Sequence, residues 1–245
     1  AFPMKKKVWV AAAVLGVVLL VAGGAMGSAF AGLVPVPPVS ELGEGVTGVA
    51  DGYVQAFIVP IGGGDALLVD CGQDPEGKAV KAQLAAKQLT VKAVVLTHGH
   101  SDHTNGCAAF PGVEFVSLET EKPVIEGAES AKGPLTKFAK NDPTKSPRVT
   151  KVVRDGETVT FGDAVVQVFS MPGHTAGSAA YLVKGVLFVG DAASGEAGGT
   201  VRIAPWAFND DPVQARQSID AIRERVKALP IRTVAFSHTG PLPKL

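Results

Sequence analysis

The sequence predicts an α/β fold, and three observations point to it. In the first half, a predicted strand, a helix and a second strand follow one another and run into a polar loop, an order typical of α/β proteins. In the second half, short β-branched and aromatic runs alternate with tight turns, and a helix precedes the last strand. With 245 residues, 46% of them hydrophobic, the chain is long enough for one sizeable globular domain.

Each strand is predicted from a short apolar run bounded by turn-forming residues. Gly62-Gly63-Gly64-Asp65 separates the first two runs and predicts a hairpin, and Gly162-Asp163 and Lys184-Gly185 act in the same way in the second half. The predicted strands, in chain order, are residues 53–60, 66–70, 91–96, 113–117, 158–161, 164–170, 179–183, 186–189 and 233–236.

Two helices are predicted from their first turns. Asp74-Pro75 and Asp211-Pro212 each supply an N-cap aspartate followed by a proline, and we expect these helices to end near Leu89 and Ala228. The residues expected to face inward are Val80, Leu84 and Leu89 in the first helix, and Val213, Ile219, Ile222 and Val226 in the second. Residues 119–147 show no clear periodicity, so we expect them to be irregular or partly helical.

The first 31 residues have the composition of an export segment. Three lysines at 5–7 precede an uncharged apolar run of about 20 residues, which is long enough to cross a bilayer, and Ala29-Phe30-Ala31 offers an A-x-A cleavage site. We therefore expect residues 1–31 to be a cleaved signal peptide or an uncleaved membrane anchor, with the rest on the periplasmic side. Proline-rich residues 32–45 are expected to form an extended linker, and residues 46–245 the folded domain.

The charge balance argues against nucleic acid as a substrate. The whole chain has 23 basic and 23 acidic residues, but three of the lysines lie in the first 31 residues. The remainder therefore keeps 20 basic and 23 acidic residues, a net charge of −3. A mildly acidic domain is a poor electrostatic partner for phosphate backbones, so we expect a small-molecule substrate.

The most specific pattern is H-x-H-x-D-H at residues 98–103, directly after a predicted strand. In an extended segment His98 and His100 project to the same side, so both imidazoles can bind one metal ion. Asp102 and His103 follow a turn and can face a second ion nearby, as in two-metal hydrolases. Nitrogen and carboxylate ligands without thiolate suit zinc, but also iron or manganese.

Together with four shorter motifs, this pattern resembles the signature of the metallo-β-lactamase superfamily. The five motifs, in order, are Leu67-Leu68-Val69-Asp70, T-H-x-H-x-D-H at 97–103, Pro172-Gly173-His174-Thr175, Gly190-Asp191 and Ser237-His238. The likeness covers about residues 50–245. It implies a four-layered αβ/βα sandwich, in which helices flank two facing mixed β-sheets and the metals lie in a cleft at one edge.

The resemblance also implies which residues bind two divalent ions, of which Zn²⁺ is the first choice. By motif, His98, His100 and His174 would bind the first ion. Asp102, His103 and His238 would bind the second, and Asp191 would bridge the two. Asp70 is expected to orient the 98–103 loop through hydrogen bonds without binding metal.

If Asp70 lies beside this loop, then Cys71 does too, and Cys107 is only four residues beyond His103. An oxidising compartment would permit these two cysteines to pair. Spacing alone does not establish disulfide geometry, and two free, buried thiols are slightly favoured.

The implied function is a metal-dependent hydrolase of small molecules. A hydroxide shared by two ions would attack an ester, thioester, lactone or amide carbonyl, with Asp102 positioning this nucleophile. Asp191 resembles the bridging aspartate of glyoxalase II-like and lactonase-like members, whereas β-lactamases usually carry cysteine or serine there, so β-lactam hydrolysis is less favoured. Residues 194–209, with Trp206 and Phe208, are expected to form part of the substrate wall, with core packing as the alternative for these aromatics.

Two other functions stay open. A persulfide dioxygenase-like oxidoreductase would use a single iron, held by His98, His174 and Asp191. A noncatalytic binding protein is disfavoured because all seven ligand positions are intact.

Overall fold

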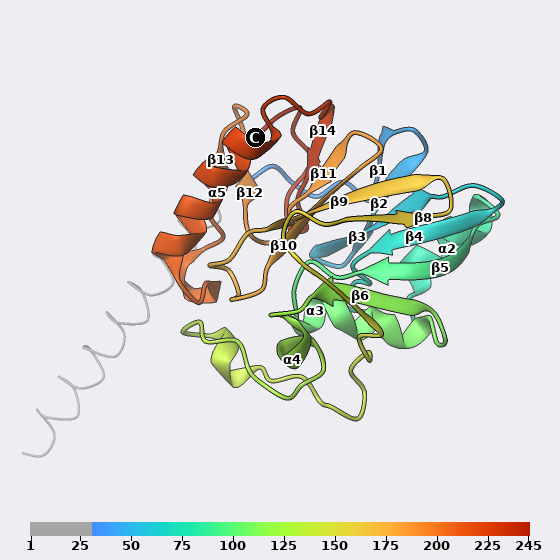
Figure 1. Ribbon diagram of the computed structural model, residues 1–245, viewed down its shortest axis with the longest axis horizontal. Coiled ribbons are helices and arrows are strands. Elements are labelled where there is room, and N and C mark those ends of the chain that lie inside the picture. The colour runs from blue at the N-terminus through green and yellow to red at the C-terminus, as the bar shows by residue number, and fades with distance from the viewer. Residues whose placement is uncertain (1–30) are drawn as a thin grey trace, which may run out of the picture. The chain divides into compact units, whose positions relative to one another are not determined.

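Two mixed β-sheets form the centre of the fold (Figure 1). The computed structural model describes residues 31–245, and residues 34–245 form one unit. The larger sheet has the order β1-β2-β3-β4-β5-β6-β7, antiparallel from β1 to β4 and parallel from β4 to β7. Its strands are β1 (Val39–Gly43), β2 (Val46–Asp51), β3 (Val54–Pro60), β4 (Asp65–Val69), β5 (Thr90–Val95), β6 (Glu114–Leu118) and β7 (Lys151–Val153).

The smaller sheet has the order β14-β11-β10-β9-β8, with only the β11–β14 pair parallel. Its strands are β8 (Thr158–Phe161), β9 (Ala164–Ser170), β10 (Ala179–Val183), β11 (Val186–Phe188) and β14 (Thr233–Ala235). A further two-stranded ribbon pairs β12 (Ser194–Gly195) with β13 (Val201–Arg202).

Three apolar cores define four layers. The first core lies between the two sheets, where the rings of Phe57 and Phe188 have centroids 5.0 Å apart. A second core packs helix α2 (Lys78–Ala86) on the outer face of the larger sheet, and a third packs helix α5 (Pro212–Val226) on the outer face of the smaller one. The predicted αβ/βα sandwich is confirmed.

The N-cap of α5 forms as predicted, because the Asp211 carboxylate accepts hydrogen bonds from the Val213 and Gln214 backbone N–H groups. Ile219, Ile222 and Val226 face inward as expected. Val213 does not, and its side chain is 61% exposed. At 3.6 residues per turn, Val213 lies two and a half turns from Ile222 and therefore on the opposite face of the helix.

Helix α2 begins later than predicted, at Lys78, because the Asp74 carboxylate accepts the N–H groups of Glu76 and Lys78 in a turn that precedes the helix. Short helices α3 (Ser101–Thr104) and α4 (Lys122–Ile125) and 3-10 helices complete the fold. The 3-10 helices are Asn105–Ala109, Thr136–Phe138 and Trp206–Phe208.

The sheet begins earlier in the chain than predicted. Strand β1 lies inside the range 32–45 that was expected to be a linker, and the Pro38 carbonyl accepts a hydrogen bond from the Ala50 N–H. Proline removes a donor but not an acceptor, so a proline-rich segment can lead into an edge strand. The folded unit therefore starts near Val34, whose N–H donates to the Gly195 carbonyl.

The predicted export segment falls almost entirely on residues 1–30, which lie outside the described residues. Among residues 31–245, no helix combines the length and the hydropathy that a membrane crossing needs. The export segment stays a prediction from the sequence.

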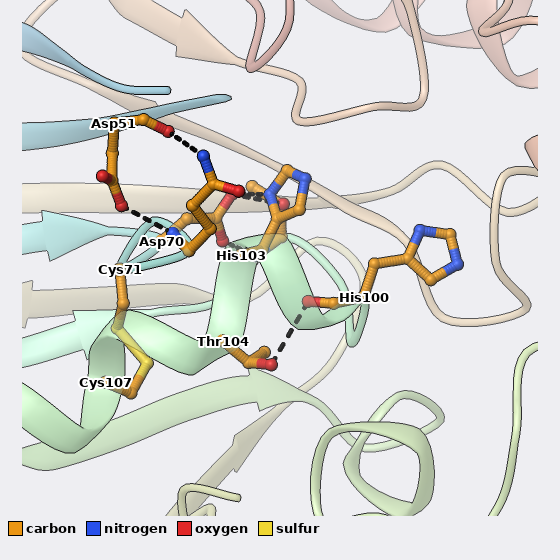
Figure 2. Close-up of a disulfide and its surroundings, with 9 residues drawn as sticks. Asp51, Asp70, Cys71, His100, His103, Thr104 and Cys107 are labelled. Atoms are coloured by element: carbon orange, nitrogen blue, oxygen red, sulfur yellow. Dashed lines mark hydrogen bonds and ion pairs between the residues drawn. A yellow bond between two sulfur atoms is a disulfide. The ribbon is translucent and has the colours of Figure 1, made fainter. Parts of the chain in front are cut away.

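Cys71 and Cys107 form a disulfide (Figure 2). The expectation of two free thiols was therefore wrong. The Cys71 N–H donates to the His103 carbonyl and the Gly106 N–H donates to the Gly72 carbonyl, so the two segments run side by side. A Cβ on Gly106 would lie 2.1 Å from the Cys71 carbonyl oxygen, and this close approach leaves the two cysteine Cα atoms 5.1 Å apart.

Candidate metal centre

The structure brings all seven predicted ligand residues together at the ends of strands. The loop 97–103 follows β5 of the larger sheet. His174, Asp191 and His238 follow β9, β11 and β14 of the smaller sheet. The site is therefore built by both sheets, from segments separated by up to 140 positions in the sequence.

The first cluster consists of His98, His100, His174 and Asp191. His98 Nε2 and His174 Nε2 each lie 3.0 Å from His100 Nδ1, and one ligand atom from each of the four residues lies within 4.8 Å of the others. Nitrogens about 2 Å from a tetrahedral ion would be about 3.3 Å apart. Three convergent imidazoles with these separations can therefore hold one ion.

The second cluster consists of Asp102, His103 and His238, whose ligand atoms also lie within 4.8 Å of one another. His238 Nε2 is 3.3 Å from Asp102 Oδ2. Asp191 lies between the clusters, because its Oδ1 is 3.4 Å from His103 Nε2 and its Oδ2 is 3.5 Å from His174 Nε2 and 3.0 Å from His238 Nε2. Its carboxylate could therefore contribute a ligand atom to either cluster.

The pKa directions match these roles. Burial lowers the pKa values of His98 and His174, and that of His100 to about 3, so the first cluster presents neutral imidazoles, the form that binds metal. In the second cluster burial lowers the pKa of His238, but the Asp191 charge and the hydrogen bonds that His238 donates to the Asp102 and Asp191 carboxylates raise it to about 10. The carboxylates thus favour positive charge in this cluster.

Two buried polar atoms support occupation by cations. His103 Nε2 and Asp191 Oδ1 are both buried, and neither makes a hydrogen bond with the described residues. The two atoms lie 3.4 Å apart, and burying polar atoms without hydrogen bonds is costly unless they are paired with a charge or coordinate metal. The residues therefore fit a pair of divalent ions, which nitrogen and carboxylate donors of this kind bind.

The ring orientation of four histidines is fixed by a hydrogen bond at Nδ1, the ring nitrogen that faces away from the centre. Each donates its Nδ1–H to an oxygen and leaves Nε2 free for the centre, which is the usual arrangement of metal-binding histidines. The pairs are His98 with Thr97 Oγ1 (3.1 Å), His103 with Asp70 Oδ2 (2.8 Å), His174 with Asn209 Oδ1 (3.2 Å) and His238 with the Tyr53 carbonyl (2.8 Å). His100 differs and directs Nδ1 to the centre.

Comparison with known proteins decides the family. The family model described as "Metallo-beta-lactamase superfamily" matches residues 49–238. This chain belongs to the metallo-beta-lactamase superfamily. Among superfamily structures, it is similar to a metallo-beta-lactamase of Cronobacter sakazakii, with a TM-score of 0.62, 17% identity and coverage of 86% and 81% of the two chains. It is also similar to a subclass B3 metallo-beta-lactamase of Bradyrhizobium japonicum, with a TM-score of 0.59 and 21% identity. That match covers 86% of this chain and 81% of the other. These likenesses show the fold.

Curated relatives in the superfamily include hydroxyacylglutathione hydrolases. That of Shewanella baltica (strain OS223) is 33% identical over 157 residues, which cover 64% of this chain and 51% of the relative. That of Vibrio campbellii is 29% identical over 173 residues, which cover 69% of this chain and 54% of the relative. The chain thus spans about half the length of the curated relatives it matches.

Asp70 supports the superfamily's metal-binding loop as expected, without lying in either cluster. Its carboxylate is fully buried and accepts hydrogen bonds from the Thr97 N–H (2.8 Å), the Thr97 hydroxyl (2.7 Å) and His103 Nδ1 (2.8 Å). Figure 2 shows Asp70 beside His103, next to the disulfide. One side chain therefore sets both the start of the loop and the orientation of His103.

Replacing Asp70 with asparagine should weaken metal binding at the second cluster by roughly 10- to 100-fold, the usual cost of losing an outer partner of a metal-binding histidine. An amide has one acceptor oxygen, and its NH₂ group would face a donor. Zinc affinity measured by competition with a chelator checks this, with the exposed Asp220→Asn as control. Unchanged zinc affinity in Asp70→Asn would contradict the role given to Asp70.

Some residues that support the loops of the metal centre were not predicted from the sequence. Glu121 is buried, accepts the N–H groups of Gly99 (2.9 Å) and Gly177 (2.8 Å), and has its pKa raised by burial to about 7. Asn141 donates to the Gly99 carbonyl at 2.6 Å. Glu121 and Asn141 lie in the stretch 119–147, which carries no motif or periodicity, so a single sequence offers no signal for them.

Proposed function

We propose that this chain is a binuclear metal-dependent hydrolase that cleaves an ester, thioester, lactone or amide bond of a small molecule. The observation that carries the proposal is the convergence of seven nitrogen and carboxylate donors into two clusters that share Asp191. When bound, divalent ions of the kind this site fits, with Zn²⁺ as first choice, lower the pKa of water and polarise a carbonyl. The hydroxyacylglutathione hydrolases among the relatives favour an acyl thioester.

Asp102 is the residue proposed to orient the attacking water. Burial raises the pKa of its carboxyl, but the charge of His103 and the hydrogen bond from His238 lower it to about 2. The side chain is 18% exposed, the largest value among the three carboxylate groups Asp70, Asp102 and Asp191. An ionised and accessible carboxylate can accept a hydrogen bond from water and direct its lone pair at a substrate carbonyl.

Trp206 is proposed as part of the substrate wall. Its side chain is 61% exposed, so core packing does not account for it, whereas Phe208 is half-buried. The segment is tied to the site, because the Asn209 amide donates to the Ala204 carbonyl while its oxygen faces His174 Nδ1. An exposed indole in a segment that Asn209 anchors to His174 suits contact with an apolar part of a substrate.

The test is metal content combined with a substrate panel on the full chain. We expect about two zinc ions per chain and hydrolysis of at least one of a set of esters, thioesters, lactones and β-lactams, lost with a chelator and restored by zinc. A single iron with sulfur-dependent oxygen uptake would replace the proposal with a persulfide dioxygenase-like reaction. A fully metallated sample that hydrolyses nothing in the panel would indicate a binding protein.

We also propose that the protein is exported to the periplasm. The lysine-led apolar segment in residues 1–31 supports export, as does the Cys71–Cys107 disulfide, since disulfides persist in oxidising compartments. Cell fractionation with thiol labelling checks this. A cytoplasmic protein whose two thiols label without prior reduction would contradict it.

A further inference from the structure

Glu121 connects two loops that are far apart in the sequence. It immediately precedes α4, and its side chain is completely buried. Oε1 accepts the Gly99 N–H at 2.9 Å and Oε2 accepts the Gly177 N–H at 2.8 Å, across separations of 22 and 56 residues. Each oxygen of one carboxylate therefore serves a different loop.

These two loops supply every histidine of the first cluster. Gly99 lies between His98 and His100, and Gly177 follows His174 by three residues. The Gly99 peptide is held at both ends, because its N–H donates to Glu121 while its carbonyl accepts from the Asn141 amide at 2.6 Å. The backbone positions from which His98 and His100 project are thereby fixed.

Both loops lie directly against the backbone around Glu121. A Cβ on Gly177 would be 2.5 Å from the Glu121 nitrogen, and a Cβ on Gly99 would be 2.7 Å from Val124 Cγ1 and 2.9 Å from the Ile125 nitrogen. Such distances leave no room for a side chain, so only glycine permits this approach. The carboxylate of Glu121 spans the point where the three segments meet.

A buried carboxylate at this point is costly unless it serves donors that would otherwise be unpaired. Burial raises the pKa of Glu121 to about 7, while the Thr175 hydroxyl and the two glycine N–H groups oppose this rise. Removing the acceptor would leave the N–H groups of Gly99 and Gly177 buried and unsatisfied. This one side chain therefore adds to the cost of loosening both loops.

We propose that Glu121 is a positioning residue that holds the His98–His100 loop and the His174 loop in register for a single metal ion. The inference rests on the proposed metal-dependent function and adds a residue that touches neither ion nor substrate. Its role is to bring the three imidazoles together before metal arrives.

The test uses Glu121→Gln in the full chain, with Glu119→Gln as the matched control, since Glu119 is exposed and pairs with Arg154. Because an amide has one acceptor oxygen, at least one of the two N–H groups loses its partner. In metal-free protein we expect amide hydrogen exchange to rise at least about tenfold at Gly99 or Gly177, with no change in α5. Zinc affinity of the first cluster should fall by roughly 10- to 100-fold.

A purely structural role would raise exchange throughout the protein, including α5, and would overturn the inference. Wild-type exchange rates and zinc affinity in a folded Glu121→Gln protein would overturn it as well. If Glu121→Gln does not fold, Glu121→Asp, which keeps the charge but shortens the reach, takes its place with the same expectations. The exchange measurement needs no metal, so a wild-type chain that binds no zinc would refute the proposed function without deciding the role of Glu121.

Discussion

Replacing Asp191 with asparagine should lower kcat/KM by more than about 100-fold, since even the outer partners of metal ligands cost 10- to 100-fold. The asparagine keeps the shape but removes the charge that lies 3.0 Å from His238 and 3.4 Å from His103. Burial raises the pKa of Asp191, yet the charges of His238 and His103 hold it well below its usual range, so the residue acts as an anion.

The metal content of Asp191→Asn should fall with activity, from about two ions per chain to one or fewer, because two cations placed together need a shared anion. Elemental analysis and steady-state kinetics on the same sample measure both effects. Asp220→Asn is the control, since its carboxylate is exposed and pairs only with Arg223 among the described residues. Two tightly bound ions in Asp191→Asn would show that the residue does not bridge the clusters.

Removing the disulfide should have the second-largest effect. In the double variant Cys71→Ala/Cys107→Ala, the free energy of unfolding should fall by about 4 kcal/mol, because the cross-link closes a loop of 36 residues in the unfolded chain. For a domain of this size the Tm should fall by about 10 °C. Urea and thermal unfolding of the metal-free proteins measure this loss.

A reducing agent supplies the matched control for the disulfide. It should lower the Tm of the wild-type protein toward that of the double variant, and it should leave the double variant unchanged. Because the Cys71 N–H also bonds the His103 carbonyl, the same variant should bind zinc more weakly at the second cluster. A wild-type Tm that does not respond to reduction would contradict the stabilising role.

The strands of the smaller sheet could be predicted closely, because the chain marks them locally. Strands β8, β9 and β10 have the predicted bounds, with the turn at 162–163 between the first two. Strands β1, β2 and β7 were missed. β1 and β2 carry glycines, β1 directly follows a proline-rich stretch, and β7 is only three residues long, so their pairing depends on neighbours that the local sequence does not show.

The same distinction holds for the site. His98 and His100 could be placed together because they alternate in one extended segment after a strand, whereas Asp191 was assigned through the resemblance to the superfamily motifs. The groups that hold these ligand residues in place could not be predicted from the sequence. The oxygen that fixes His238 is the backbone carbonyl of Tyr53, and any residue type supplies a carbonyl. Glu121 acts through glycine N–H groups, which leave no trace of their partner in the sequence.

If metal ions bind at both clusters as proposed, they link the two sheets, because each sheet supplies part of the ligands. The larger sheet contributes the loop 97–103, and the smaller sheet contributes His174, Asp191 and His238. An ion bound by residues of both sheets is released if the sheets separate. Separating the two sheets therefore costs the free energy of metal binding in addition to the free energy of packing. The concentration of free metal around the protein would then affect how long the folded protein survives, as well as how fast it works.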